Sequence, residues 1–578
     1  MSKTPDFNKA IEKILSALGP QQKTCRQCTQ VFTIYQEDID FYKVFKVPSP
    51  TLCPQCRLQK KMGYRINIVP VFYKKDCSAP GHSERVISTY APDNPLKIYD
   101  YNFLHSYVWE SMDFGQNYNP NEQFFKQLGN FIQKAPHPAI YKDPKGVNSE
   151  YVVSGLAPKN CYYSAVPYNS ENIYYSSTIL YSKDCLDCVY LDSCQSCYGA
   201  VNLFRCYNCF FCYDSQECLD SFFLFNCRNC QYCFGSSNLR NKKYYFFNQP
   251  LPQEEYEQKI KQINLGERII LHEYKMKFEN VLNLAIHKNT NNLKVINSTG
   301  NDLRECKNCF YCFEVWGGCE NLRYSASLEK SNNVMDFFGG VHNSFVYEAT
   351  GISYCNDIKF CLQCRHSSNL EFCCECHNCN YCFACFGLKN KKYCIFNKQY
   401  SESEYWQLVD KIKSQMLAEG EYGQFLPLEI AWVPYNDSSA STELPLSEVE
   451  IKQRGWHFQE MVKSEIDLSR VPLVRANDLP DNIKNVNEDI LEKVIVCFSS
   501  GKPFKLTKFE LDFYRNHNLP LHIEHPAERI RDLLKDFRHP YKLWQYPCSL
   551  CGQTMHSGWD PAKNYKVYCE ACYLKEVV

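Results

Sequence analysis

The spacing of the cysteines constrains the fold of this chain more than any other feature of the sequence. Of the 36 cysteines, 26 lie between Cys161 and Cys394, and those from Cys185 to Cys233 are separated only by multiples of three residues. A similar phrase returns in this block as CYNCFFCY, CRNCQYCF, CKNCFYCF and CHNCNYCF, and the first two copies lie 21 residues apart. A short fixed period is typical of a solenoid, in which each coil buries its face against its neighbours.

We therefore predict a fold that is mainly β with α, built around a central parallel β-solenoid with coils of about 21 residues. Tyr, Phe, Val and Cys are punctuated by Asn, Asp, Ser and Gly, which favours short strands and turns. A second repeat carries LRNKKYYFFN from Leu239 onto LKNKKYCIFN from Leu388, 149 residues later, so the solenoid is expected in two halves. Small side chains should stack inside the coils, with Asn or Asp at the corners.

The cysteines of the solenoid have two interpretations. Free cysteine is a small, readily buried hydrophobe that can fill a narrow interior, whereas columns of thiols can bind metal ions or form disulfides. Other coils carry Ser164, Leu191 and Ala200 in the same columns, and metal ligands do not interchange with leucine. The sequence therefore favours packing, and metal storage or thiol redox chemistry is the alternative.

Two further cysteine clusters lie near the ends of the chain and follow a different rule. Each consists of two C-x2-C pairs, a spacing that brings four thiolates around one ion and suits Zn2+. Because four thiolates leave no open coordination position, we expect two structural zinc ions and no catalytic metal. The predicted ligands are Cys25, Cys28, Cys53 and Cys56 in the N-terminal cluster, and Cys548, Cys551, Cys569 and Cys572 in the C-terminal cluster.

The two end regions also resemble each other. A shift of 472 residues places Cys25 on Cys497 and Arg57 on Arg529, which indicates a duplicated module that once held two metal sites. In the N-terminal copy, only Cys77 remains of the second site. The first site of the C-terminal copy is reduced to Cys497, Ser500, His525 and Glu528. We treat Cys497, His525 and Glu528 as a candidate degenerate metal site, with a vestige as the favoured interpretation.

Composition and helical periodicity divide the chain into eight segments. Apolar residues at helical spacing on both sides of Gly266 predict a helical hairpin, and a capping box from Ser401 to Glu404 begins another helix. The predicted segments are an N-terminal zinc-ribbon module (1–105), a linker with helix (106–160), solenoid half A (161–250), the hairpin (251–300), solenoid half B (301–398), a capping helix (399–420), an extended linker (421–495) and a C-terminal zinc-ribbon module (496–578).

Charge and hydropathy exclude several classes of protein. The chain has 64 Lys and Arg against 64 Asp and Glu, so no net charge draws the whole protein to nucleic acid or to an anionic membrane. No run approaches the roughly 18 apolar residues of a membrane span, and the first residues lack a signal-peptide core. We therefore expect a cytoplasmic protein without a membrane partner, in which thiols are metal ligands or buried groups.

Our functional hypothesis is a non-enzymatic zinc-binding scaffold for a macromolecular partner, either a protein or RNA or another single-stranded nucleic acid. Cations interleaved with aromatic rings suit phosphates and unstacked bases, although a solvated amphipathic helix explains the same pattern. The candidate nucleic-acid contacts are Arg57, Lys60, Lys61, Arg65, Lys74 and Lys75. Their C-terminal counterpart has Arg529, Arg531, Lys535, Arg538 and Lys542 beside Phe537, Tyr541 and Trp544.

A carbohydrate-active β-helix enzyme is a further alternative, because such enzymes group carboxylates on one face. Here Asp184, Asp187, Asp214 and Asp220 occupy positions that other coils fill with Asn, as expected of corners. The sequence shows no nucleophile elbow, phosphate loop or HExxH motif. We therefore predict no catalytic residue.

The N-terminal run CRQCTQVFTIYQEDIDFY, followed by VPSPTLCPQCR, resembles a group of uncharacterised cysteine-rich zinc-ribbon proteins common in candidate-phylum bacteria with reduced genomes. The NKKY-x2-FN phrases and the closing YKVYCEACYLKEV extend the resemblance over most of the chain. The group usually has a Tyr-Ser-Pro turn where this chain has Trp559-Asp560-Pro561. The resemblance implies a bacterial zinc-binding protein and implies no particular activity.

Overall fold

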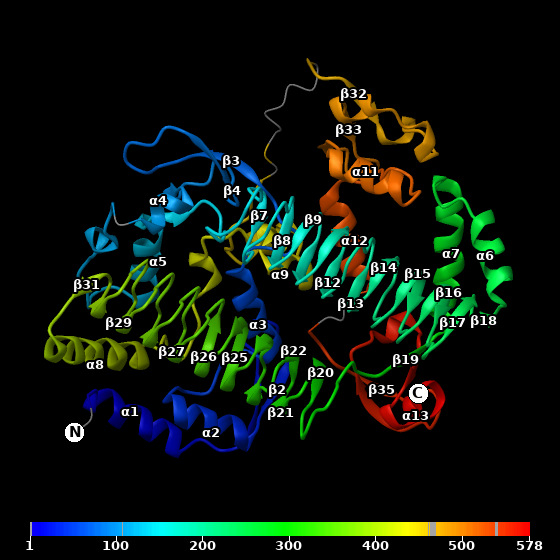
Figure 1. Ribbon diagram of the computed structural model, residues 1–578. Coiled ribbons are helices and arrows are strands. Elements are labelled where there is room, and N and C mark those ends of the chain that lie inside the picture. The colour runs from blue at the N-terminus through cyan, green and yellow to red at the C-terminus, as the bar shows by residue number, and fades with distance from the viewer. Residues whose placement is uncertain (1–2, 107, 461, 463–469, 538–540) are drawn as a thin grey trace.

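The structure of the protein is a computed structural model that describes residues 3–106, 108–460, 462, 470–537 and 541–578. Two long stacks of parallel strands lie beside one another, and helices and small hairpins from both ends of the chain pack around them (Figure 1). We call the first, residues 147–250, stack A, and the second, residues 293–399, stack B.

Short strands build both stacks. Stack A contains β7 (Val152–Val153), β8 (Ser164–Tyr168), β9 (Glu171–Tyr174), β10 (Ser177–Leu180), β11 (Lys183–Leu186), β12 (Val189–Asp192), β13 (Val201–Phe204), β14 (Tyr207–Phe210), β15 (Leu219–Phe225), β16 (Gln231–Ser237), β17 (Lys243–Phe246) and the antiparallel β18 (Gln249–Pro250). Stack B contains β20 (Gly300–Leu303), β21 (Lys307–Phe310), β22 (Cys312–Trp316), β23 (Glu320–Arg323), β24 (Ala326–Glu329), β25 (Asn332–Val341), β26 (Ser344–Thr350), β27 (Asn356–Lys359), β28 (Ser368–Glu371), β29 (Asn380–Phe383), β30 (Lys392–Ile395) and the antiparallel β31 (Lys398–Gln399).

Most parallel strand partners in the two stacks share one constant offset along the sequence. In stack A Val189 pairs with Val201, and in stack B Leu370 pairs with Cys382, so that the partners differ by 12 in residue number. The offset widens to 13 where β21 pairs with β23. The chain thus returns to the same position every 12 residues. The coil of about 21 residues that we predicted from the sequence is therefore wrong.

A unit of three residues explains why the sequence suggested the wrong period. Every third residue from Ser154 to Phe247 has a positive φ, and so has every third residue from Asn321 to Phe396. The residue after most of these turns is buried, as Cys185 is after Asp184. Because interior positions recur every three residues, any multiple of three produces similarity along the sequence, and 21 is one of these multiples.

Asn and Asp occupy many of the turns, as expected from the sequence, because they tolerate a positive φ better than most side chains. Their side chains also connect successive levels of the stack. The Asn160 amide donates to the Asn172 side-chain oxygen at 3.3 Å, and the Asn172 amide donates to the Asp184 carboxylate at 2.6 Å. These ladders hold the corners of neighbouring levels in register.

Helices follow each stack, as predicted. After stack A, α7 packs Phe278 against Phe223 with ring centroids 5.6 Å apart. After stack B, Ser401 and Glu404 form the predicted capping box, since each side chain bonds the other residue's backbone N–H. The helices around the stacks are α5 (Phe124–Lys134), α6 (Gln253–Gln262), α7 (Arg268–Leu284) and α8 (Glu402–Ala418).

The ends of the chain form two small modules. The N-terminal module contains α1 (Pro5–Ser16), β1 (Gln21–Thr24), β2 (Val31–Ile34), α2 (Gln36–Phe45), α3 (Pro54–Gly63), β3 (Tyr73–Asp76), β4 (Arg85–Ser88), β5 (Ile98–Tyr99) and α4 (Tyr101–His105), and β5 pairs with β6 (His137–Pro138). The C-terminal module contains β32 (Leu473–Arg475), β33 (Val494–Val496), β34 (Pro503–Phe504), α11 (Lys508–Asn516), α12 (Pro526–Phe537), β35 (Trp544–Pro547), β36 (Thr554–Ser557), β37 (Lys566–Tyr568) and α13 (Glu570–Val577), and β37 pairs with β19 (Ile286–Lys288).

Equivalent hydrogen bonds relate the two modules. The N–H of Cys25 donates to the carbonyl of Gln30 at 2.9 Å, and at the matching position of the C-terminal module the N–H of Cys497 donates to the carbonyl of Lys502 at 3.0 Å. Each module packs on the stack that is remote from it in sequence. The N-terminal α3 lies against β25 and β26 of stack B, and the C-terminal α12 lies against β12 of stack A (Figure 1).

The segment after α8 packs into the core instead of running as an extended linker. Tyr422, Phe425 and Trp432 are buried, and the rings of Phe425 and Trp432 both contact Tyr64 of the N-terminal module. The segment carries α9 (Ser439–Glu443) and α10 (Glu448–Gln453). Among the helices described, none is long and apolar enough to cross a membrane.

Candidate metal centres and ligand pockets

The first predicted cysteine cluster is assembled by a hairpin turn and a helix start. Cys25 and Cys28 lie on the turn between β1 and β2, while Cys53 caps α3 and Cys56 lies in its first turn. The four sulfur atoms lie within 4.8 Å of one another. Hydrogen bonds from Cys56, together with the other two thiols, lower the pKa of Cys53 to about 5, so this sulfur is readily a thiolate.

The second predicted cluster has the same construction. Cys548 and Cys551 lie on the turn between β35 and β36, while Cys569 caps α13 and Cys572 lies in its first turn, with the four sulfurs again within 4.8 Å. Burial opposes ionisation, but backbone N–H groups of Cys551 and Cys569 lower the pKa of Cys548 to about 6. Both tetrads can therefore hold a metal ion.

The candidate degenerate site is not assembled. Among the described residues, Cys497, His525 and Glu528 do not converge as a ligand set. The Cys497 thiol donates to Glu524 at 2.9 Å, and Glu528 pairs with Lys502 at 3.3 Å and with Arg531 at 2.8 Å. These candidate ligands make hydrogen bonds and ion pairs with other residues instead.

A third group of ligand atoms was missed by the sequence analysis. Cys77, His82 and Glu84 bring a sulfur, a ring nitrogen and a carboxylate oxygen within 4.8 Å of one another. The sequence contains these residues as the motif C-x4-H-x-E. This motif has a single cysteine and lacks the C-x2-C pairs that identified the other two sites. Across the described parts of the chain three such groups form, and none contains a cysteine of the stacks.

The cysteines of the stacks are packed as core residues. All 36 cysteines of the chain are free thiols, and those between Cys161 and Cys394 are buried. One column at 12-residue spacing contains Ser164, Ser176, Cys188, Ala200, Cys212 and Leu224, all of which are buried. Burial raises the pKa of Cys161 to about 11 and that of Cys355 to about 12, whereas burial of Cys361 is outweighed by hydrogen bonds from neighbouring thiols, which lower its pKa to about 6.

Three of the six predicted N-terminal nucleic-acid contacts are buried. Arg57 and Lys61 are at most 3% exposed and pair with Asp336 and Glu348 of stack B, and the Lys75 ammonium donates to three backbone carbonyls. Their burial corrects the expectation that they contact phosphates. Lys60 and Arg65 are half-buried, and Lys74 is exposed.

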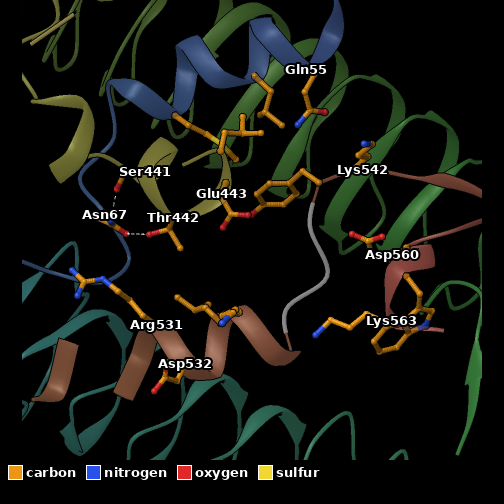
Figure 2. Close-up of a pocket in the computed structure, with 18 of the residues that line it drawn as sticks. Gln55, Asn67, Ser441, Thr442, Glu443, Arg531, Asp532, Lys542, Asp560 and Lys563 are labelled. Carbon is orange, nitrogen blue, oxygen red and sulfur yellow. Dashed lines mark hydrogen bonds between the residues drawn. The ribbon is translucent and has the colours of Figure 1, made fainter. Parts of the chain in front are cut away.

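The C-terminal basic segment differs, because several of its cations line a pocket. Arg529 is buried and pairs with Asp187 of stack A, whereas Arg531, Lys535 and Lys542 line a pocket of about 760 Å3. Arg538 and the side chain of Phe537 lie outside the described residues. The pocket lies between α3, the segment around α9, α12 and the C-terminal hairpin, and Figure 2 shows Arg531 and Lys563 on opposite sides of it.

The lining of this inter-module pocket combines charge with aromatic surface. It contains the cations Arg531, Lys535, Lys542 and Lys563, the carboxylates Glu443, Glu528, Asp532 and Asp560, and the rings of Tyr541, Trp544 and Trp559. The Lys542 ammonium lies 5.1 Å from the centroid of the Trp544 ring. Across the cavity, the Asn67 side chain bonds Ser441 and Thr442 (Figure 2).

A second pocket, of about 450 Å3, lies between the two stacks and is acidic, whereas cations and carboxylates are equal in number in the inter-module pocket. Its aromatic lining consists of Tyr181, Tyr190, Phe204 and Trp316. Its charged lining consists of one arginine and five carboxylates: Arg304, Asp192, Asp302, Glu305, Glu314 and Glu329. Burial raises the pKa of Asp192. This inter-stack pocket therefore repels phosphate.

No family model matches this chain. The curated proteins and the solved structures likewise show no significant match to it. Its function has to be inferred from its own geometry.

The arrangement offers two sets of four thiols, one three-ligand group, one pocket with balanced charges and one acidic pocket. A closed shell of four thiolates stabilises a small module and gives a substrate no place on the metal.

Proposed function

We propose that the protein is a non-enzymatic, zinc-dependent scaffold that binds single-stranded nucleic acid, RNA in particular, in the inter-module pocket. The observation that carries the proposal is the lining of that pocket, which brings four cations together with the rings of Trp544 and Trp559. Cations match phosphates, and each nucleobase has a face that stacks on an aromatic ring.

In this proposal both stacks are β-solenoids with a 12-residue coil. The support is the parallel pairing at this constant offset and the positive φ at every third position. A solenoid is a rigid support with regular outer faces, and the two here hold the modules on either side of the inter-module pocket. The thiols inside serve packing, which leaves metal binding to the ends of the chain.

Zinc has a structural part in the proposal. Tetrahedral sets of four thiolates select zinc or iron among common metals, and two C-x2-C knuckles are the usual framework of a structural zinc ion. The C-terminal tetrad belongs to the same hairpin that supplies Trp544, and the pocket residues Trp559 and Lys563 lie between its two knuckles. Zinc binding there fixes one wall of the pocket.

The charge balance of the pocket sets the expected binding mode. Four carboxylates offset the four cations, so long-range attraction is weak and direct contacts dominate. Among the cations, Lys535, Lys542 and Lys563 are exposed and can reach a phosphate. A short single-stranded segment with one or two stacked bases fits this chemistry better than a duplex, whose bases are already stacked.

The test is fluorescence anisotropy with a short, labelled single-stranded RNA of mixed sequence, measured over a range of salt concentrations. The variant K535E/K563E should weaken binding at least about tenfold and reduce the salt slope by about 1.4, for two lost contacts at about 0.7 each. W544A should weaken binding by about 1–3 kcal/mol with little change in the salt slope.

The matched control is K9E/K13E, which makes the same change of charge on the exposed face of α1, a helix that contributes no residue to the lining of the pocket. It should bind RNA like the unmodified protein. Absence of RNA binding, or equal effects of the two double variants, contradicts the proposal. Binding of a peptide with no RNA binding would assign the pocket to a protein partner and would contradict it as well.

The inter-stack pocket favours a second candidate, a neutral oligosaccharide. Aromatic rings beside carboxylates suit the faces and hydroxyl groups of a sugar, and the pocket presents Tyr181, Tyr190 and Trp316 beside five carboxylates. Calorimetric titration with a panel of neutral oligosaccharides tests this candidate. Binding that is lost in W316A supports it, and absence of heat with the whole panel rejects it.

A further inference from the structure

We infer that Cys77, His82 and Glu84 form a third metal site, which takes a zinc-class divalent ion with an open coordination position. The Cys77 sulfur, a ring nitrogen of His82 and a Glu84 carboxylate oxygen lie within 4.8 Å of one another. Sulfur, imidazole nitrogen and carboxylate oxygen are the three ligand types that zinc accepts in proteins.

The hairpin of β3 and β4 builds this group. Cys77 follows β3 directly and is 7% exposed, while His82 and Glu84 lie on the loop that returns to β4, with side chains 28% and 52% exposed. His82 Nδ1 contacts the Glu84 carboxylate. Both ligand atoms thus already face each other beside the sulfur, on the open side of the hairpin.

The C-terminal metal centre provides an independent observation, because its backbone repeats this geometry. The Cys77 N–H donates to the Glu84 carbonyl at 3.1 Å, and the Cys548 N–H donates to the Gln553 carbonyl at 2.9 Å. The N–H of Asp100 donates to the Cys77 sulfur at 3.3 Å. The equivalent bond runs from the Cys569 N–H to the Cys548 sulfur, also at 3.3 Å.

The same comparison shows how the ligand set has changed. Asp100 caps α4 where Cys569 caps α13, and Phe103 stands three residues later, as Cys572 does. The knuckle that supplies two thiolates in the C-terminal centre is therefore replaced. In compensation, the loop between Cys77 and Glu84 is two residues longer than its C-terminal counterpart and includes Gly81 at φ 79°.

Phe103 now covers the side from which the second knuckle would bind. Its ring packs edge-to-face on the His82 ring, with centroids 4.7 Å apart, and so fixes the orientation of the imidazole. Three protein ligands leave one position of a tetrahedral ion for solvent or another small ligand. An ion held this way exchanges more readily than one enclosed by four thiolates.

The test uses the full-length protein with both cysteine tetrads filled with Zn2+, and Co2+ as the probe. Co2+ bound by a thiolate gives a charge-transfer absorption that Co2+ on carboxylates alone does not give. The unmodified protein should bind one equivalent with this absorption. H82A and E84Q should each weaken binding at least about tenfold, and C77A should abolish the absorption.

The matched control is D76N, which removes a carboxylate from the same hairpin at a position whose side chain is 84% exposed. It should leave Co2+ binding unchanged. Retention of two zinc ions per chain in every variant shows that the modules remain folded. The inference is overturned if the unmodified protein gives no thiolate absorption, if C77A keeps it, if H82A and E84Q bind normally, or if D76N weakens binding as much as E84Q.

Discussion

The Nε atom of Arg57 donates to the Asp336 carboxylate at 2.9 Å, and this bond joins the N-terminal module to stack B. The C-terminal module repeats the contact on stack A, where Arg529 lies 3.3 Å from Asp187. The two arginines are 472 residues apart and the two aspartates 149 residues apart, which are the two offsets of the sequence repeats. The protein thus contains two equivalent junctions.

A second pair of contacts completes each junction. Tyr324 of stack B donates to Asp38 of the N-terminal module at 3.1 Å, and Tyr175 of stack A donates to Glu510 of the C-terminal module at 2.9 Å. The two tyrosines are 149 residues apart, and the two acidic residues are 472 residues apart. Burial makes each network costly to break, because a lost partner leaves a charge unpaired in the core.

The first prediction concerns the Arg57 junction. R57M should lower the free energy of unfolding by about 3–5 kcal/mol, since it leaves Asp336 and Glu348 without their guanidinium. Urea unfolding measures the effect, and R205A, which removes a 62%-exposed cation of stack A, should change stability by less than about 1 kcal/mol. The double variant R57M/D336N should recover part of the free energy of unfolding that R57M loses. Equal stability of R57M and R205A contradicts this account of the junction.

The second prediction concerns metal removal. A strong chelator should make residues 21–63 and 544–578 susceptible to limited proteolysis, because thiolates without an ion repel one another and the knuckles open. The stacks should stay resistant, since their cores contain no metal ligand set among the described residues. Mass spectrometry of the first fragments locates the cleavages. First cleavages inside stack A or stack B argue against metal-dependent modules.

The third prediction concerns the interior of the stacks. Ser176 donates to the Tyr174 carbonyl at 2.8 Å, just as the Cys188 thiol donates to the Leu186 carbonyl at 3.2 Å. C188S should therefore cost only about 1 kcal/mol of stability, whereas C188D should cost several because it buries a charge. Both should retain the zinc content of the unmodified protein. Loss of metal from C188S is the outcome that supports metal storage instead.

The fourth prediction concerns acid stability. Against the effect of burial, Lys359 and Lys413 lower the pKa of Glu371 to about 2, and Lys413 lies 2.8 Å from its carboxylate. Because the pKa of Glu371 lies below its ordinary value of 4.5, its ionised carboxylate stabilises the folded state by about 3 kcal/mol above pH 4.5. This contribution falls as the pH drops from about 4.5 towards 2. In E371Q this part of the acid dependence disappears.

The measurement for Glu371 is the urea midpoint of both proteins between pH 6 and about pH 3. Loss of metal in acid affects both equally, so the difference between them isolates Glu371. That difference should shrink as the pH falls. E217Q, with a carboxylate 55% exposed beside Arg205, is the matched control and should follow the unmodified protein. A constant difference between E371Q and the unmodified protein refutes the assignment.

The two tetrads were predictable because a C-x2-C knuckle is a local feature whose geometry needs only four residues. The coil length was not, since Cys185 and Cys206 are related by the three-residue unit and not by one turn of the stack. Nothing in the sequence distinguishes 12 from 21 when both are multiples of the same unit. Strand pairing decides between them.

The basic segments show a second limit. Arg57 and Arg531 look alike in sequence, but Asp336 neutralises the first from 279 residues away, while the second lines a pocket. A buried carboxylate so distant in the chain leaves no local trace. The site at Cys77 was missed for a related reason, since His82 and Glu84 become ligands only when the loop folds back.

Zinc content per chain, measured by elemental analysis after dialysis against a weak chelator, tests the central claim most directly. The account predicts two tightly bound zinc ions, one lost in C28S/C53S, the other lost in C551S/C569S, and both retained in C188S. Many ions per chain, or two ions retained when either tetrad is disrupted, would contradict it.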